Sequence, residues 1–270
     1  MEITSSRHQS SAAGMLTTER KAFILDRLRL DGRIVAKDLA RELTLSEDTL
    51  RRDLRELAAD GLLSRVHGGA LPATSASATS SKRWSISPQS KEAAAKVAAG
   101  LVQPGQVIFL DGGTTIAQMA RMLPRDIALT VVTHSPVVAV ELAEHDKIDI
   151  EIIGGKLFKH SMVTMGAAVA DYVAGIHVDV FFMGATGVHP EMGFTTGNAE
   201  EAVIKRIVSR QAAETLVLAS REKLGIAAAF RVLAISDVDG LIVAPDTPTE
   251  LVAPYREQGL TILPDRVPEL

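Results

Sequence analysis

The sequence predicts an α/β protein built from two domains, and three observations support this prediction. First, the chain has 270 residues, which is long for one domain, and 46% of them are hydrophobic, enough for sizeable cores. Second, residues 17–71 show helical patterns followed by a short hairpin. Third, residues 91–270 alternate apolar runs with helical patterns, which is typical of a mostly parallel sheet with helices on both faces.

The composition excludes several classes of protein. The chain has no cysteine, so disulfides and thiolate metal sites are excluded and a cytoplasmic location is expected. No apolar stretch is long enough to span a membrane, and the first residues contain no apolar segment typical of a secretory signal. We expect residues 1–16 to form a disordered tail, and the start of translation is open between Met1 and Met15.

The helical patterns in residues 17–71 are punctuated by capping and turn residues. A first helix is expected after Thr18 and a second within "RIVAKDLARELTL", and Ser46 is placed to cap a third, "EDTLRRDLRELAADG". On this third helix Leu50, Leu54 and Leu57 recur at i, i+4 and i+7 and form one apolar seam. The segment "LLSRVHGGA" then predicts a hairpin-like wing.

This order of elements predicts a winged helix-turn-helix, in which the third helix enters the DNA major groove and the wing contacts the flanking backbone. Arginine side chains can bind guanine edges or phosphates from such a helix. The alternative is a solvated helix face whose arginines pair with Asp48, Asp53 and Glu56. Because the net charge is −4, DNA binding would rest on locally placed cations. The candidate DNA-binding residues are Ser46, Thr49, Arg51, Arg52, Arg55, Arg65, His67 and Gly68.

Residues 72–90 are rich in Ser, Ala and Thr and are expected to be a linker. Beyond them, residues 91–270 contain seven apolar runs that predict strands. These are "QVIFLD", "LTVVT", "IDIEIIG", "VDVFFMG", "ETLVLA", "GLIVA" and "LTILP". Helical patterns separate most of them, which favours a parallel arrangement.

Small polar residues and glycines follow several of these strands. In "FLDGGTT" and "TVVTHSP" these residues lie where a strand ends and a helix begins, and in "FMGATG" glycines and a threonine also follow a predicted strand. Ligands of open α/β sheets bind at the carboxyl ends of the strands, where free backbone N–H groups favour an anion. Taken singly, each loop could be only a tight turn. Lys156, Lys205 and Lys223 could add charge to a phosphate site or could be surface lysines.

Two stretches resemble a known family residue by residue. Thr49–Leu54, "TLRRDL", and Arg65–Ala70, "RVHGGA", resemble the DNA-binding domain of DeoR-type transcriptional regulators. The similarity continues through the second domain. It implies an α/β sensor domain whose fold resembles that of sugar-phosphate isomerases and whose pocket binds a phosphorylated sugar.

Carried over by motif, the resemblance implies a set of effector-binding residues. They are Asp111, Gly112, Gly113, Thr114, Thr115, Thr133, His134, Gly184, Gly187 and Lys223. The chain departs from the family pattern in two places, because Ser220 stands where many members have Asp and His134 where many have Asn. Both changes put the usual ligand in doubt.

We therefore expect a repressor of a sugar or carbohydrate operon. Its partners would be a double-stranded DNA operator, a small phosphorylated sugar, and further copies of itself in a dimer or tetramer, with no membrane partner. No cofactor and no metal are expected, since the histidines show no i, i+4 pair. One alternative is a phosphosugar isomerase, with Glu200 or Glu201 as base and Lys223 holding phosphate. Another is a regulator whose second domain only oligomerises.

Overall fold

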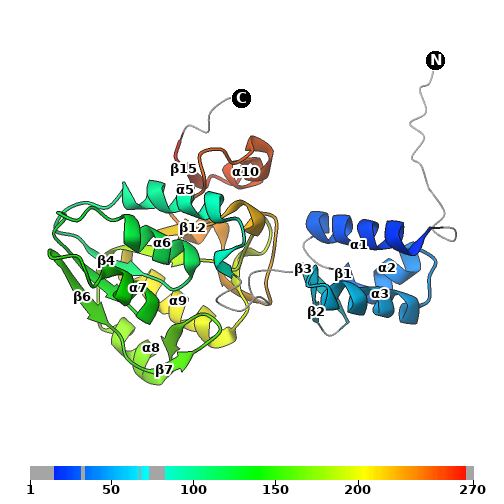
Figure 1. The fold of residues 1–270 in the computed structure, drawn as a ribbon, viewed down its shortest axis with the longest axis horizontal. Helices are drawn as coiled ribbons and strands as arrows, with labels where there is room; N and C mark the ends of the chain where they lie inside the picture. Colours follow the sequence, from blue (N-terminus) through cyan, green and yellow to red (C-terminus); the bar gives the residue numbers. More distant parts are fainter. Residues whose placement is uncertain (1–14, 32–33, 67, 73–82, 266–270) are drawn as a thin grey trace, which may run out of the picture. The chain divides into compact units, whose positions relative to one another are not determined.

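The computed structural model describes residues 15–31, 34–66, 68–72 and 83–265. The chain divides into two compact units, residues 1–73 and 74–270. The two units are drawn in Figure 1, and each buries its own apolar side chains, in one cluster in the first unit and in two clusters in the second. The predicted tail, apart from residues 15 and 16, lies outside the described residues.

The N-terminal unit contains three helices and a three-stranded antiparallel sheet. Its elements follow in the order α1 (Thr17–Asp31), β1 (Ile34–Val35), α2 (Ala36–Glu42), α3 (Glu47–Ala59), β2 (Leu63–Val66) and β3 (Gly69–Pro72). The strand order is β1-β3-β2, with β2 and β3 forming the wing. At Gly69 a side chain would collide with the backbone of β1, because an added Cβ would lie 1.8 Å from the Ile34 carbonyl oxygen. The predicted winged helix-turn-helix is confirmed.

Helix α3 forms as its sequence predicts. The Ser46 hydroxyl accepts a hydrogen bond from the Thr49 N–H at 3.1 Å and thereby caps the helix. Leu50, Leu54 and Leu57 are buried and pack against α1 and α2 in the core of this unit.

The C-terminal unit is built on a seven-stranded sheet in which every pairing is parallel. The strand order is β15-β14-β12-β9-β4-β5-β6. In sequence these strands are β4 (Val107–Leu110), β5 (Leu129–Thr133), β6 (Ile148–Ile152), β9 (Val178–Gly184), β12 (Ala212–Leu218), β14 (Gly240–Ile242) and β15 (Thr261–Leu263). They fall in the seven predicted apolar runs, so the mostly parallel α/β fold is confirmed.

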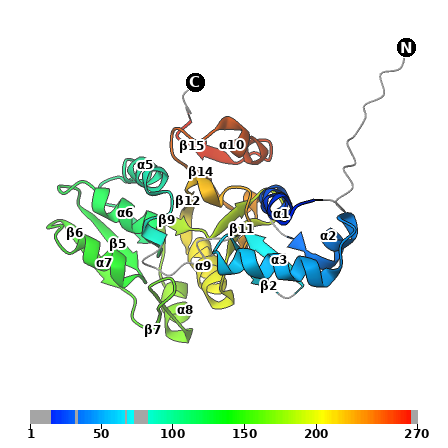
Figure 2. The ribbon, with the colours of Figure 1, turned by 45° about the vertical axis from the view of Figure 1, so that its right-hand side comes forward.

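Helices cover both faces of this sheet (Figures 1 and 2). Helices α5 (Pro88–Ala99), α6 (Thr114–Met122) and α7 (Pro136–Leu142) bury their apolar side chains with Ile108, Leu110 and Phe182 on one face. Helices α8 (Ala167–Ala174), α9 (Ala199–Gln211) and α10 (Thr249–Arg256) pack with Phe109 and Phe181 on the other. Strand residues alternate between the two cores because successive side chains of a strand point to opposite faces.

Several shorter elements were not expected from the sequence. A hairpin pairs β7 (Lys156–Phe158) with β8 (Val163–Met165), and a small antiparallel sheet joins β10 (Gly187–His189), β11 (Gly193–Thr196) and β13 (Phe230–Leu233). Two 3-10 turns, η2 (Arg221–Lys223) and η3 (Ile235–Asp237), complete the unit. Helix α5 begins at Pro88, so the last three residues of the predicted linker are helical. None of the helices in the described ranges is long and apolar enough to cross a membrane.

The packing of α3 makes the first prediction. Leu54 is 2% exposed in the core of the N-terminal unit, so Leu54→Ala should lower its free energy of unfolding by about 2–5 kcal/mol. Leu62→Ala is the control, because Leu62 is 49% exposed and its truncation should change stability by less than about 0.5 kcal/mol. Hydrogen exchange of α3 peptides across a urea series measures both. Equal effects of the two variants would contradict the burial of the α3 seam.

Candidate functional site

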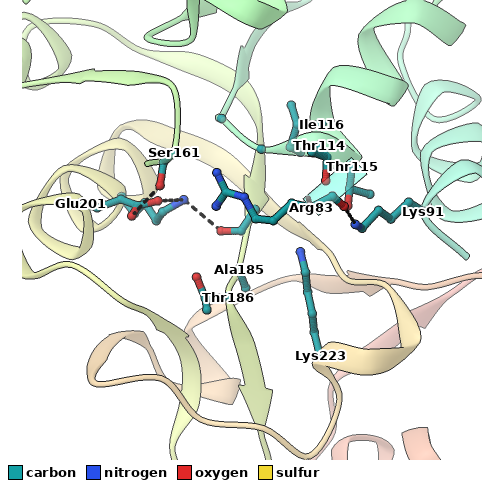
Figure 3. Close-up of a pocket in the computed structure, with 14 residues that line it drawn as sticks. Arg83, Lys91, Thr114, Thr115, Ile116, Ser161, Ala185, Thr186, Glu201 and Lys223 are labelled. Atoms are coloured by element: carbon teal, nitrogen blue, oxygen red, sulfur yellow. Dashed lines mark hydrogen bonds and ion pairs between the residues drawn. The ribbon is translucent and has the colours of Figure 1, made fainter. Parts of the chain in front are cut away.

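A cavity that is partly open to solvent and lined by both polar and apolar groups lies at the carboxyl ends of β4 and β9 (Figure 3). This is the edge of a parallel sheet at which ligands of open α/β folds bind. It receives residues from the start of α6, from the segment before α5, and from α9 and η2. The lining residues are Arg83, Lys91, Gly112, Gly113, Thr114, Thr115, Ile116, Ser161, Gly184, Ala185, Thr186, Glu201, Lys205 and Lys223.

Beneath the cavity the Asp111 carboxylate, which is 1% exposed, joins several elements. One oxygen accepts hydrogen bonds from the Gly112 N–H at 2.8 Å and from His134 Nε2 at 3.0 Å. The other accepts from the Gly184 N–H at 2.8 Å and from the Lys205 ammonium. The ends of β4, β5 and β9 and helix α9 are thus held by one side chain.

The electrostatics of this cluster favour the charged forms of both partners. Burial alone would raise the pKa of Asp111, but the Lys205 ammonium and the His134 hydrogen bond hold that pKa well below its usual range. Burial alone would lower the pKa of Lys205, but the carboxylates of Asp111 and Glu201 raise it. A buried cation and a buried anion therefore compensate each other at the floor of the cavity.

Glu201 forms the wall of the cavity on α9. Its Oε2 accepts hydrogen bonds from Thr196 Oγ1 at 3.0 Å and Ser161 Oγ at 3.4 Å, and its Oε1 lies 3.4 Å from the Lys205 ammonium. Figure 3 shows Ser161 and Glu201 facing each other on one side of the cavity. Glu200, the neighbouring carboxylate, is exposed and does not line it.

Three cations line the cavity without an ion-pair partner among the described residues: Arg83, Lys91 and Lys223. Lys91 is 1% and Lys223 9% exposed. Burial lowers the pKa of Lys223 to about 8, with Glu222 opposing the shift and the neighbouring cations adding to it. Burial also lowers the pKa values of Lys91 and Arg83. Glu222 and Glu201 lie close enough to oppose these shifts but form no ion pair with the three cations, and buried positive charges left in this state are costly unless an anion joins them.

The first turn of α6 adds hydrogen-bond donors to the same cavity. Gly113 precedes this helix at φ 115°, a conformation that favours glycine, and no side chain caps the helix. Thr114, Thr115 and Ile116 line the cavity from the first turn, and the buried Thr115 hydroxyl has no hydrogen-bond partner in the described part of the chain. An uncapped helix N-terminus presents free N–H groups and a positive dipole end, which suit an anion.

The predicted effector residues separate into three groups. Gly112, Gly113, Thr114, Thr115, Gly184 and Lys223 line the cavity. Asp111, Thr133 and His134 lie behind it: Thr133 Oγ1 donates to the Leu110 carbonyl at 2.7 Å, and His134 bonds Asp111 and the Thr164 carbonyl. Gly187 lies outside it in β10, where an added Cβ would come within 2.4 Å of the Ile226 carbonyl oxygen.

The two residues that depart from the family pattern, His134 and Ser220, both form hydrogen bonds within the protein. His134 places Nε2 3.0 Å from the Asp111 carboxylate and Nδ1 3.1 Å from the Thr164 carbonyl oxygen. Ser220 is buried just before η2 and donates to the Glu222 carboxylate at 2.7 Å.

Two other lining residues were not proposed as effector ligands from the sequence: Arg83 falls in the predicted linker, and Ser161 carries no distinctive local pattern. Ala185 and Thr186 line the cavity from within the predicted "GATG" loop. Lys91 could have been noticed, because a single lysine on the inner face of an alanine-rich helix is unusual unless it has a polar role.

The candidate DNA-binding residues lie on one side of α3 and on the wing. Arg51, Arg52 and Arg55 are exposed; Arg51 pairs with Glu47 at 2.8 Å, whereas Arg52 and Arg55 make no ion pair with a described residue. Of the three carboxylates named in the alternative interpretation, Asp53 pairs with Arg20 and Glu56 with Lys21, while Asp48 is exposed and makes no ion pair with a described residue. Thr49 contacts Ser46, Arg65 and Gly68 are exposed on the wing, and His67 lies outside the described residues.

The buried ion pair makes the second prediction. Lys205→Met should lower the free energy of unfolding by about 3–5 kcal/mol, because it leaves the Asp111 carboxylate buried without its cation. Arg206→Gln on the same helix is the control, since Arg206 makes only an exposed hydrogen bond to the Arg231 carbonyl. Urea denaturation measures both variants, and equal stabilities of Lys205→Met and wild type would contradict the role assigned to the pair.

The same pair sets a pH dependence. The pKa of Asp111 is depressed in the folded chain, so its stabilising contribution is present above about pH 4 and is lost as the pH falls further. Lys205→Met should weaken this acid dependence, because the pKa of Asp111 then loses the cation that depresses it.

Comparisons with known proteins agree with this architecture. Residues 20–76 match the DeoR-like helix-turn-helix domain and residues 86–244 match the DeoR C terminal sensor domain. The chain is 32% identical to the HTH-type transcriptional regulator GlpR of Haloferax volcanii, over 92% of this chain and 98% of that protein. It is 32% identical to the HTH-type transcriptional repressor GlcR of Bacillus subtilis, over 84% of this chain and 88% of that protein.

More distant similarities extend the list. The glycerol-3-phosphate regulon repressor of Escherichia coli is 27% identical over 88% of this chain and 95% of its own length. Among solved structures, ribose 5-phosphate isomerase A from Methanocaldococcus jannaschii is similar with a TM-score of 0.37 and 23% identity, covering 49% of this chain and 52% of that one. With both domain families matched in their expected order, the chain belongs to the DeoR family of DNA-binding transcriptional regulators.

Proposed function

We propose that this chain is a repressor of a carbohydrate operon whose hold on its operator is controlled by a phosphorylated sugar bound in the cavity of the second unit. It would act in the cytoplasm as a dimer or tetramer, because one recognition helix reads only one half-site. The names of two similar proteins support this direction, since one is a glycerol-3-phosphate regulon repressor and another a transcriptional repressor.

The observation that carries the effector proposal is the set of three cations without carboxylate partners, Arg83, Lys91 and Lys223, beside the uncapped start of α6. A phosphate group offers several strong acceptor oxygens to such donors, and hydrogen bonds between charged groups are about twice as strong as neutral ones. The unpartnered Thr115 hydroxyl supplies a further donor at the same place. This end of the cavity suits a phosphate.

The opposite side suits a polyhydroxylated body. Ser161, Thr186 and Glu201 line it, and Figure 3 shows them away from Lys91 and Lys223. Hydroxyl and carboxylate oxygens accept hydrogen bonds from sugar hydroxyls. A pocket lined only by cations would lack these acceptors and could not select a ligand by its hydroxyl groups. A phosphorylated sugar satisfies both sides, whereas an unphosphorylated one would leave the cations without a counter-charge.

We further propose that the cavity binds its ligand without turning it over. The isomerase alternative required Glu200 or Glu201 as a base. Glu200 is outside the cavity, and both oxygens of Glu201 are already engaged by Thr196, Ser161 and Lys205. Proton abstraction needs a base with an oxygen directed at the substrate carbon. Conversion of an aldose or ketose phosphate by the full chain would contradict this.

The DNA-binding proposal generates the third prediction. Arg52 is exposed on α3 without an ion pair, so Arg52→Gln should weaken operator binding about tenfold or more. If Arg52 contacts a phosphate, Arg52→Gln should weaken binding equally on all DNA sequences. The slope of log K against the logarithm of the salt concentration should then decrease in magnitude by about one. Arg256→Gln on α10 is the control and should bind as wild type does. Electrophoretic mobility shifts across a salt series measure this, and unchanged binding by Arg52→Gln would argue against its contact with DNA.

The fourth prediction concerns pH. Because the pKa of Lys223 is lowered to about 8, the affinity for a sugar phosphate should fall by up to about tenfold per pH unit above pH 8. The phosphate monoester keeps its double charge throughout this range, since its second pKa is about 6. Isothermal titration between pH 7.5 and 9.5, with the sugar phosphate that most stabilises the protein, measures the effect.

Two variants separate Lys223 from its neighbours in that titration. Lys223→Arg keeps its charge at every pH tested and should show a much flatter profile. Lys223→Met should bind more weakly already at pH 7.5 and should also be flat. A wild-type affinity that stays constant up to pH 9.5 would remove Lys223 from the binding site.

A further inference from the structure

The first described segment of the second unit runs from Arg83 to Lys91, and both of these residues line the cavity. Residues 73–82 alone separate this segment in sequence from the last strand of the N-terminal unit, β3. The effector cavity is therefore partly built by residues that follow the DNA-binding unit closely in the sequence.

Two of the three cavity cations hold this segment in place. The Arg83 guanidinium donates to the His160 carbonyl oxygen, and the Lys91 ammonium donates to the Arg83 carbonyl oxygen at 2.5 Å. Both acceptors are neutral backbone carbonyls. Figure 3 shows the Arg83 guanidinium extending across the cavity and the Lys91 ammonium meeting the Arg83 backbone.

Arg83 has room and bonding capacity to rearrange. It lines the main cavity and also a smaller neighbouring cavity, which is lined by Trp84, Val137 and Met162 among others. Its buried Nε atom has no hydrogen-bond partner in the described residues. A guanidinium with a free donor and empty space on either side can turn toward an incoming anion without displacing packed side chains.

An anion would compete with the carbonyls for these donors. Hydrogen bonds from a guanidinium or ammonium to a charged oxygen are about twice as strong as those to a neutral one. A phosphate in the cavity would therefore draw Arg83 from His160 and Lys91 from the Arg83 carbonyl. Both tethers of the segment would be exchanged for contacts to the ligand.

We propose that Arg83 and Lys91 form a tether that the effector releases. Without ligand, their N–H groups hydrogen-bond backbone carbonyls and hold the start of the second unit in place, and with ligand the same N–H groups bind the anion instead. This inference rests on the proposed function, since it names how occupancy of the same cavity is transmitted. The ligand would favour the released arrangement because there the donors of Arg83 and Lys91 that now bond neutral carbonyls would bond charged oxygens instead, which are the stronger acceptors.

Trp84 provides a direct readout. It is the single tryptophan of the chain, follows Arg83 immediately, and lies with its ring 5.0 Å from the Arg121 guanidinium carbon. Its emission therefore reports the position of this segment. The full-length protein is titrated with inorganic phosphate, with binding measured by calorimetry and Trp84 emission recorded in parallel.

The expected result is a change in Trp84 emission with the same midpoint as the calorimetric titration. In Arg83→Gln the affinity for phosphate should fall about tenfold and the emission change at saturation should be lost. Arg83→Lys should restore part of both, because it keeps the charge. Arg125→Gln is the matched control: Arg125 also donates to a backbone carbonyl, that of Glu144, but does not line the cavity, so it should match wild type. Thermal unfolding of each variant verifies that it is folded.

The outcomes separate the two proposals. Phosphate that binds wild type without altering Trp84 emission would overturn the tether and leave the effector cavity standing. An emission change of wild-type size in Arg83→Gln at saturation would also overturn it. Absence of any phosphate binding to wild type would contradict the proposed function, and the tether with it.

Discussion

The buried pair of Asp111 and Lys205 is the interaction on which the candidate site depends. Each strand of a parallel sheet is followed by a separate loop, and the hydrogen bonds between the strands do not hold these loops together. The Asp111 carboxylate joins them, because it receives donors from the backbone after β4, from His134 after β5, from the loop after β9 and from Lys205 on α9. Such a cluster is stabilising only while every buried charge is compensated. Loss of one charged partner should therefore destabilise the whole floor of the cavity.

The two units use charge in different ways. On α3 the arginines are exposed and two of them make no ion pair with the described residues, while nearby carboxylates are taken by α1. In the second unit the buried Lys91 and Lys223 and the half-buried Arg83 line a cavity and form no ion pair with a described residue, whereas Lys205 is paired with Asp111. A chain with a net charge of −4 thus provides two cationic surfaces, one suited to a polyanion and one to a small anion.

Much of this architecture could be predicted from the sequence because its signals are local. The Ser46 cap, the leucine seam of α3 and the seven Val-, Ile- and Leu-rich runs each lie within a few residues, and all appear in the structure. The strands of the small sheet and of the β7–β8 hairpin are only three or four residues long. Strands β14 and β15 are equally short but lie within longer apolar runs, whereas segments such as "KLF", "GVH" and "GFTT" do not and are ordered by their tertiary partners.

The same distinction applies to the site. The loop at Gly112–Thr115 could be proposed from its glycines, because they follow a strand and precede a helix. Ser161 and Arg83 reach the cavity only through the tertiary fold, so no local pattern marks them. Gly187 illustrates the converse, since it lies in a suggestive "GATG" motif, yet its small size serves a close backbone approach in β10.

The measurement that tests the central claim most directly is binding of the full-length protein to DNA from its own upstream region, with and without a panel of sugar phosphates and the corresponding unphosphorylated sugars. The account predicts salt-sensitive, sequence-dependent binding that at least one phosphorylated sugar shifts and that its unphosphorylated counterpart leaves unchanged. Specific binding that responds to none of the phosphates, or that responds equally to the unphosphorylated sugars, would contradict the assignment of the cavity as the control point.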